Sequence, residues 1–213
     1  MSLAPKNHNC SERFPEKPMD DSFPESDPRR KRLKEIFNDK AFLRKNQGEP
    51  PFKLASGGTS YVFFDCKLIT QDPEGISLIA ELIFERICKL DVASIGGIQT
   101  GAIPIGTAVA QLSYTRKRPI QAFWVRQEKK THGTEKWIEG NLKPNSNVVI
   151  VEDVTTKGNS VFESIDRVRE LDCNILEVIS LVDREHGARK RLNDAGYRFS
   201  SVFTISEFSQ NSN

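Results

Sequence analysis

Two neighbouring carboxylates followed by a short hydroxyl-rich loop form the most informative segment of the chain. After the apolar run Val148–Val151, residues 152–160 read EDVTTKGNS, an order that predicts a buried strand, a loop and then the start of a helix. A helix N-terminus presents unpaired N–H groups and the positive end of the helix dipole, which together favour a phosphate. Glu152 and Asp153 can accept hydrogen bonds from a sugar diol. The segment therefore predicts a site for a ligand with a phosphate and two adjacent hydroxyls, such as a ribose 5-phosphate group.

The loop within this segment carries several candidate phosphate contacts. Thr156 and Ser160 supply hydroxyl donors, and Gly158 allows the backbone to approach an anion closely. Lys157 is either a phosphate contact or an exposed loop cation, and the sequence leaves both open. Neither G-x-x-x-x-G-K-[ST] nor G-x-G-x-x-G occurs, so this is not one of the common nucleotide-binding loops. The alternative for the whole segment is an ordinary helix start beside two incidental acids.

Residues 152–160 resemble the phosphoribosyl-pyrophosphate signature of the type I phosphoribosyltransferases. The resemblance implies that Glu152 and Asp153 hold the ribose hydroxyls. It also implies that the loop holds the 5-phosphate through Thr156, Lys157, Gly158, Asn159 and Ser160.

Two segments before the signature resemble the orotate phosphoribosyltransferases of that family. Residues 52–65, FKLASGGTSYVFFD, resemble the family's F-x-L-x-S-G segment with paired aromatics near the base, here Phe63 and Phe64. Neighbouring residues of a strand face opposite ways, so one of the two rings is expected in the core while the other faces the base. Residues 96–104 occupy the place of the family's pyrophosphate loop, which implies diphosphate contacts from Gln99, Thr100 and Gly101.

Residues 125–140, VRQEKKTHGTEKWIEG, resemble the flexible catalytic loop of the same enzymes, whose pattern is R-K-x-x-K-x-H-G. Arg126, Lys130 and His132 match it, and the resemblance implies that they act in catalysis with Asp153, closing over the diphosphate and excluding water. The chain departs from the pattern at Gln127, where the family has a lysine. It departs again at Ala55, where many members have a lysine. A third departure lies around Gln99–Gly101, where some members have a lysine.

Residues 182–187, VDREHG, resemble the late strand end whose arginine contacts orotate, here Arg184. The alternative for Arg184 is a structural ion pair with Asp183 or Glu185.

The elements that must position these residues follow from the pattern of apolar residues. Strands and helices alternate along the chain, which predicts an α/β fold with a mostly parallel central sheet and helices on both faces. The expected strands are 92–95, 120–125, 148–151, 175–182 and 199–205, and the expected helices are 28–44, 73–87, 104–112, 161–171 and 188–195. Short strands at 52–55 and 61–67 precede this body. The resemblance implies that the fold is type I phosphoribosyltransferase-like, with a small N-terminal hood.

The chain of 213 residues is long enough for one domain with a full core. We expect that domain to span residues 28–208. Residues 1–27 contain four prolines and few aliphatic side chains, so they are expected to form a disordered tail.

Composition excludes several other classes of protein. There are 31 basic and 29 acidic side chains and a formal net charge of +2, which gives no general signal for nucleic-acid binding. We interpret the basic run Arg29–Arg32 as a solvated helix face rather than a nucleic-acid patch. No stretch approaches the ~18 apolar residues of a membrane span, and residues 1–20 lack the apolar region of a secretory signal.

The cysteines Cys10, Cys66, Cys88 and Cys173 contain no C-x-x-C pair. We therefore expect free thiols and a cytoplasmic protein. From the charge balance and the lack of a long apolar stretch we expect that it binds neither membrane nor nucleic acid.

Taken as a member of the orotate phosphoribosyltransferases, the chain is expected to convert orotate and phosphoribosyl pyrophosphate to orotidine 5′-phosphate and diphosphate in pyrimidine (UMP) biosynthesis. The resemblance implies Mg²⁺ as cofactor, held mainly by the substrate rather than by side chains. It also implies a homodimer in which the loop 126–140 reaches the neighbouring subunit's site. Two alternatives stay open: a phosphoribosyltransferase for another base, and a non-catalytic regulator that senses phosphoribosyl pyrophosphate.

Overall fold

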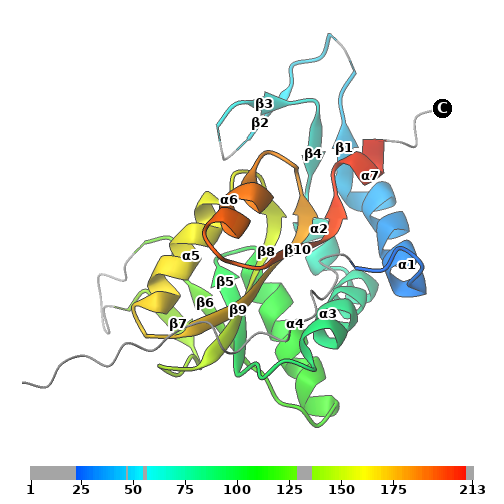
Figure 1. Cartoon of the computed structure of the whole chain (residues 1–213). Helices are drawn as coiled ribbons and strands as arrows, with labels where there is room; N and C mark the ends of the chain where they lie inside the picture. The colour runs from blue at the N-terminus through cyan, green and yellow to red at the C-terminus, as the bar shows by residue number, and fades with distance from the viewer. Residues whose placement is uncertain (1–22, 47, 55–56, 129–135, 210–213) are drawn as a thin grey trace, which may run out of the picture.

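A six-stranded sheet forms the centre of the molecule (Figure 1). The computed structural model describes residues 23–46, 48–54, 57–128 and 136–209. The strands lie across the sheet in the order β10 (Phe199–Thr204), β9 (Asn174–Asp183), β8 (Asn147–Thr155), β5 (Ser94–Ile98), β6 (Gln121–Val125) and β7 (Ile138–Gly140). Neighbouring strands of this sheet run parallel except β6 and β7, which are antiparallel. The predicted α/β class and mostly parallel sheet are confirmed.

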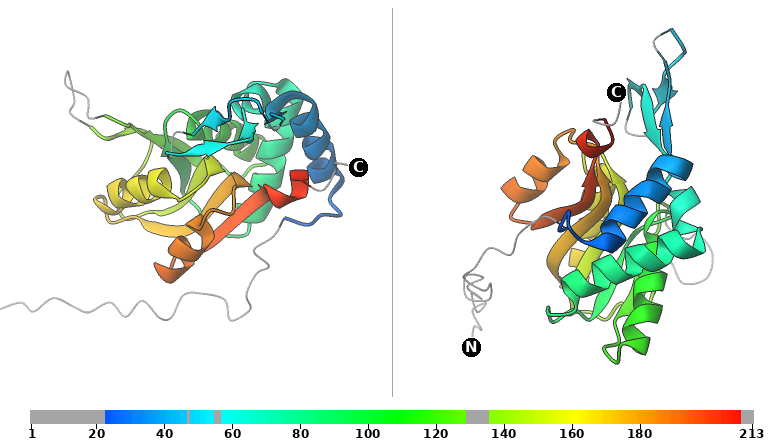
Figure 2. Two further views of the ribbon diagram at one scale, coloured as in Figure 1. Left: turned by 90° about the horizontal axis from the view of Figure 1, so that it is seen from above. Right: turned by 90° about the vertical axis from the view of Figure 1, so that its right-hand side faces the viewer.

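Helices cover both faces of the sheet (Figure 2). The helices α1 (Pro28–Ile36), α3 (Pro73–Ile87) and α4 (Ala102–Thr115) pack with the sheet in one apolar cluster. The helices α5 (Asn159–Arg169) and α6 (Ala188–Asp194) pack in a second cluster on the opposite face. The chain leaves β5 through α4 towards β6 and leaves β8 through α5 towards β9, so the direction of winding reverses between β5 and β8. In open sheets of this kind ligands bind at such a switch point, beyond the carboxyl ends of the strands.

The longest helix shows how local sequence sets an element. Asp72 precedes α3 and accepts a hydrogen bond from the backbone N–H of Gly75 at 2.8 Å, and Pro73 occupies the first helical position. Both features favour a helix start. Ile79, Ile83 and Ile87, spaced by about one helical turn, are fully buried against the sheet.

The described residues between positions 42 and 64 form a small unit that projects from the carboxyl edge of the sheet and is called the hood below (Figure 1). It contains β1 (Phe42–Arg44) paired antiparallel with β4 (Val62–Phe64), and β2 (Phe52–Lys53) paired antiparallel with β3 (Thr59–Ser60). Three short elements complete the described chain: the π-helical turn η1 (Phe37–Ala41), α2 (Lys67–Thr70) and α7 (Ser206–Ser209).

Several element boundaries differ from the prediction by a few residues, and the strand expected at 61–67 ends at Phe64 before α2 begins at Lys67. Two further differences bear on the hood and on the site. The helix expected to reach residue 44 ends at Ala41, because residues 42–44 pair with β4 instead. The strand expected to end at Val151 continues to Thr155, because β8 stays paired with β9 as far as Asp183. Glu152 and Asp153 therefore lie inside a strand rather than after it.

The prediction that the tail extends to residue 27 was wrong at its end. Phe23 is only 4% exposed and belongs to the main core, with the guanidinium of Arg86 5.1 Å from the centre of its ring. Asp27 caps α1 by accepting a hydrogen bond from the backbone N–H of Arg29 at 2.9 Å. The buried ring of Phe23 and the cap formed by Asp27 together attach this proline-containing stretch to the body. Residues 1–22 lie outside the described part of the chain.

Within the described ranges, no helix combines the length and the apolar character needed to cross a bilayer.

Candidate active site

The acidic pair lies at the carboxyl end of β8, on one side of the switch point. Glu152 is 5% exposed, and its Oε2 accepts a hydrogen bond from the Ser160 hydroxyl at 2.7 Å. Its Oε1 accepts from the backbone N–H of Asp153 at 3.2 Å. Burial raises the pKa of Glu152 well above its usual range, and the neighbouring carboxylate of Asp153 raises it further. The structure thus connects the predicted ribose-binding acid directly to the predicted phosphate loop.

The predicted pyrophosphate loop lies against Asp153 from the other side of the switch point. The loop begins where β5 ends at Ile98, and the backbone N–H of Gln99 is anchored on the carbonyl of Val125 at 2.8 Å. A Cβ atom on Gly101 would lie 2.6 Å from the Asp153 carboxyl group, so only glycine fits here without moving that side chain. Residues 99–101 and Asp153 therefore border one site, although they are distant in sequence.

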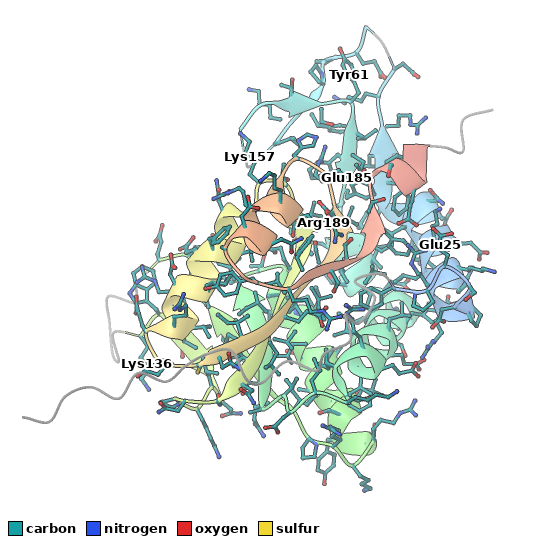
Figure 3. All side chains as sticks on the ribbon, in the orientation of Figure 1. Glu25, Tyr61, Lys136, Lys157, Glu185 and Arg189 are labelled. Atoms are coloured by element: carbon teal, nitrogen blue, oxygen red, sulfur yellow. The ribbon has the colours of Figure 1, made fainter. Side chains whose placement is uncertain are left out.

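The loop between β8 and α5 is shaped to receive an anion. Gly158 adopts a left-handed conformation with φ of +79°, which glycine alone adopts at little cost. The helix α5 begins at Asn159 and has no side-chain N-cap hydrogen bond, so its first amides are left for a ligand or water. Thr156 is half-buried and Lys157 is exposed. In Figure 3 Lys157 lies at the edge of the body from which the hood projects.

Arg184 lies between the body and the hood. It is 3% exposed, and its Nη2 donates to the Ser60 hydroxyl at 2.9 Å and to the Val62 carbonyl at 3.2 Å. Its Nε is buried and has no hydrogen-bond partner among the described residues. Burial lowers the pKa of Arg184 below its usual value. A buried guanidinium with an N–H left over is well suited to an acidic ligand.

The ion pairs weighed as an alternative for Arg184 are not formed. Asp183 accepts from the backbone N–H of Glu185 at 2.8 Å, and it lies 3.5 Å from Nε of Arg189. Glu185 accepts from the backbone N–H of Ser206 at 3.1 Å. Asp183 therefore stabilises the turn that carries Arg184, and Glu185 links that turn to the start of α7, rather than neutralising the charge of Arg184.

The two predicted aromatic contacts of the base have different environments. Phe64 is 4% exposed, and its ring lies 5.1 Å from that of Phe42 and 5.0 Å from that of Phe208. The prediction of a substrate contact from Phe64 was wrong, because the alternation of side chains along β4 turns this ring into the core. Phe63 is half-buried beside Phe52, with 5.5 Å between ring centres, and stays the candidate of the pair.

The predicted catalytic loop is described only at its two ends. Arg126 follows β6, and its backbone N–H donates to the carbonyl of Trp137 at 2.8 Å. Its Nη1 lies 3.7 Å from Oε1 of Glu139. Lys130 and His132 lie outside the described residues, so their roles stay predictions.

Sequence reasoning missed two residues that hold Arg184 in place. Asp183 was considered only as an ion-pair partner. An aspartate whose side chain accepts a hydrogen bond from the backbone N–H two residues later, here that of Glu185, is typical of an Asx turn. Ser60 carries no such signal, because it lies 124 positions from the arginine that it contacts.

Comparison with known proteins decides the family. The model of the phosphoribosyl transferase domain family matches residues 67–210. An orotate phosphoribosyltransferase from Rhodopseudomonas palustris (strain BisB5) is 42% identical over 183 residues, which span 84% of this chain and 95% of the relative. The chain belongs to the orotate phosphoribosyltransferase family.

Further relatives and solved structures agree with this membership. An orotate phosphoribosyltransferase from Aquifex aeolicus is 40% identical over 159 residues, 75% of this chain and 87% of the relative. The structure of the Mycobacterium tuberculosis H37Rv orotate phosphoribosyltransferase in complex with 5-phospho-α-D-ribosyl 1-diphosphate superposes with a TM-score of 0.68. It is 26% identical and covers 86% of this chain and 93% of its own. The resemblance seen in the sequence is thereby confirmed at the level of the orotate phosphoribosyltransferase family and its fold.

Proposed function

We propose that this protein transfers the 5-phosphoribosyl group of phosphoribosyl pyrophosphate to orotate, giving orotidine 5′-phosphate and diphosphate. The observation that carries the proposal is one juxtaposition at the carboxyl edge of the sheet. The acidic pair and phosphate loop of β8 lie beside the loop after β5, while a buried arginine from the end of β9 faces the hood. Membership of the orotate phosphoribosyltransferase family supports orotate as the base.

The part of the site that faces phosphoribosyl pyrophosphate is called the donor side. It contains hydrogen-bond acceptors and hydrogen-bond donors in the order that this substrate requires. Glu152 and Asp153 accept from the two ribose hydroxyls, and residues 156–160 donate to the 5-phosphate. Residues 99–101 border the diphosphate, because Gly101 lies directly against Asp153. The close approach of these groups supports a single extended ligand rather than separate ones.

The base side recognises an acidic ring. Arg184 offers a guanidinium whose planar fork matches a carboxylate with two parallel hydrogen bonds. Its contacts with Ser60 and Val62 hold that fork under the hood, beside the strand that carries Phe63. The ring of Phe63 packs against one face of the base.

The reaction breaks the bond between ribose C1 and a diphosphate oxygen and forms a bond from C1 to a ring nitrogen of orotate, which gives up its proton. Positive charge develops on the ribose ring while negative charge develops on the diphosphate. Catalysis then consists mainly of holding the reactants in line and stabilising the leaving charge. Lys130, Arg126 and His132 supply this stabilisation when the loop 126–140 closes, and closure keeps water from the reactive centre.

Magnesium fits the oxygen-rich character of the site. Mg²⁺ prefers carboxylate, hydroxyl and phosphate oxygens and usually keeps several waters. The carboxylates of Glu152 and Asp153 are of this type. Within the described residues there is no cluster of three or more metal-ligating side chains, so the substrate's diphosphate and hydroxyls would provide the other ligands. When bound, the ion neutralises charge on the diphosphate.

We propose a homodimer in which the loop 126–140 of one subunit reaches the site of the other. An open, mainly apolar groove of about 670 Å³ is lined by Thr100 and Gly101 of the pyrophosphate loop and by α2 and α4 residues that include Thr70, Ile103 and Pro104. Leu68, next to this groove in sequence, is 48% exposed. An apolar surface beside the site supports contact with a second copy.

Subunit mixing tests the shared loop. Asp153→Asn and Lys130→Ala subunits, each at least about tenfold less active alone, should regain up to about a quarter of wild-type activity after mixing, because about half of the dimers are mixed and one of the two sites in each mixed dimer combines two intact parts. Mixtures that stay as inactive as the separate variants would contradict a loop that crosses between subunits.

A cytoplasmic location is proposed on the state of the cysteines. Cys66, Cys88 and Cys173 are free thiols, which is usual in a reducing compartment.

The proposed reaction is tested by diphosphate release with orotate and, as matched control, with uracil, which is orotate without its carboxylate. We expect release with orotate and almost none with uracil, adenine or hypoxanthine. Release with a purine instead would identify a transferase for another base. Binding of phosphoribosyl pyrophosphate without release for any base would favour the non-catalytic regulator.

A further inference from the structure

One residue of α6 reaches across to the loop that precedes α5. Arg191 donates from Nη1 to the backbone carbonyl of Lys157 and to Oδ1 of Asn159, the latter at 2.8 Å. Its guanidinium also lies over the ring of Phe162, 4.9 Å from the ring centre. Arg191 thus contacts the loop at its apex, at the first residue of α5 and one turn into the helix.

The hydrogen bond to Lys157 sets the direction of the next amide. The peptide between Lys157 and Gly158 is trans and planar, so its N–H points opposite to its carbonyl. Because the carbonyl points towards Arg191, the N–H of Gly158 points away from α6. This amide lies at the start of α5, where no side-chain cap occupies the helix end.

The hydrogen bond to Asn159 sets the orientation of its side-chain amide. Arginine has only donors, so Asn159 must present its oxygen to Arg191. The NH₂ group of Asn159 is then turned away from Arg191, with two donors for another partner. A phosphate dianion offers acceptors only, and it matches those donors.

We propose that Arg191 is a positioning residue for the 5-phosphate of the donor, acting through the Lys157 carbonyl and the Asn159 amide. The inference rests on the proposed function, because it takes the phosphomonoester of the donor as the ligand of this loop. The guanidinium of Arg191 also adds a positive charge beside the helix N-terminus.

Steady-state kinetics of Arg191→Ala, Arg191→Lys and the control Lys190→Ala test the proposal. Lys190 is the neighbouring α6 residue, with a side chain 81% exposed and paired with Asp194 of the same helix. Arg191→Ala should raise the KM for phosphoribosyl pyrophosphate about tenfold, the effect of losing one or two hydrogen bonds that orient charged contacts. The KM for orotate and kcat should change little, and Lys190→Ala should resemble the wild type. Arg191→Lys should lie between them, because one ammonium does not reproduce the fork. Equal effects on both substrates would overturn the proposal.

A double-mutant cycle tests whether Arg191 acts through Asn159. Asn159→Ala should raise the same KM, and the double variant should be no worse than Arg191→Ala alone. Effects that multiply fully would show that the two residues act independently and would overturn this route.

Inorganic phosphate separates this inference from the proposed reaction. Millimolar phosphate should raise the thermal unfolding temperature of the wild type and of Lys190→Ala clearly more than that of Arg191→Ala. This result in a protein that does not use orotate would refute the proposed function and leave the inference standing. Equal stabilisation of Arg191→Ala, or none of the wild type, would overturn the inference.

Discussion

The donor side and the base side of the site are assembled from the chain in different ways. The donor side is centred on one continuous segment, residues 152–160, in which Ser160 bonds to Glu152 across a single strand-to-helix turn. The base side joins Arg184 to Ser60 and Val62 of the hood, across separations of 124 and 122 positions. A continuous segment keeps most of its geometry through local hydrogen bonds, whereas a site between distant segments depends on how the hood packs on the body. Substitutions in the two regions should therefore affect the two substrates separately.

The largest effect is expected from Asp153→Asn on the donor side. Losing a charge-assisted hydrogen bond to a ribose hydroxyl, worth roughly 1.5–3 kcal/mol, should lower kcat/KM for phosphoribosyl pyrophosphate about ten- to hundredfold. The fold should persist, because asparagine keeps a side-chain oxygen that can accept the hydrogen bond from the backbone N–H of Val154, which Asp153 accepts at 2.7 Å. Steady-state kinetics with both substrates measure the effect. Unchanged KM and turnover would remove Asp153 from the site.

Arg184→Lys is the matching change on the base side and should raise the KM for orotate about tenfold. A lysine keeps the charge and loses the fork, so the KM for the donor should change far less. Ser60→Ala provides a milder version, since it removes one contact of the guanidinium and keeps the guanidinium itself. If Arg184→Lys changed both KM values equally, the two sides of the site would not be separable.

Glu152→Gln, on the donor side, should lower transferase activity and raise the free energy of unfolding. The pKa of Glu152 is raised in the folded protein by burial and by Asp153, so the folded state binds this proton more tightly than the unfolded state does. The free energy of unfolding of the wild type therefore falls as pH rises from about 4.3, the ordinary value for glutamate, through the raised pKa. Glutamine removes this dependence.

Urea unfolding between pH 4 and pH 8 measures the change in stability, as the difference in unfolding free energy between Glu152→Gln and the wild type. The stability advantage of Glu152→Gln over the wild type should grow as pH rises. Its transferase activity should be lower than that of the wild type. A difference that does not depend on pH would contradict the raised pKa.

The smallest effects should separate the two rings of β4. Phe64→Leu should cost the fold about 1 kcal/mol, as usual when a core side chain loses part of its volume, and leave the KM for orotate unchanged. Phe63→Leu should raise the KM for orotate a fewfold with little loss of stability. Denaturant unfolding and kinetics on both variants test the assignment, which the reverse pattern would contradict.

Prediction from sequence succeeded where the physical signal was local or periodic. The helix beginning at Pro73 was predicted from its proline start and its isoleucine spacing, and its buried face agrees with that spacing. Interactions between distant segments caused the errors. The helix expected to reach residue 44 gives way to β1, because pairing with β4 outweighs the local preference of those residues. Phe23 belongs to the core and contacts Arg86 of α3, which is distant in the sequence. No pattern of residues near Phe23 predicts this contact.

The family, the alternation of strands and helices, and the continuous acid–loop–helix segment of the donor side could all be read from the chain, because each depends on residue types at short spacings. Tertiary contacts set which acid is buried, which of two adjacent rings enters the core, and what surrounds Arg184 and Arg191. Those properties arise from side chains brought together by sheet order and by the packing of α6 and the hood on the body. Spacing along the chain carries no information about such contacts, because the separations involved exceed any helical or strand period.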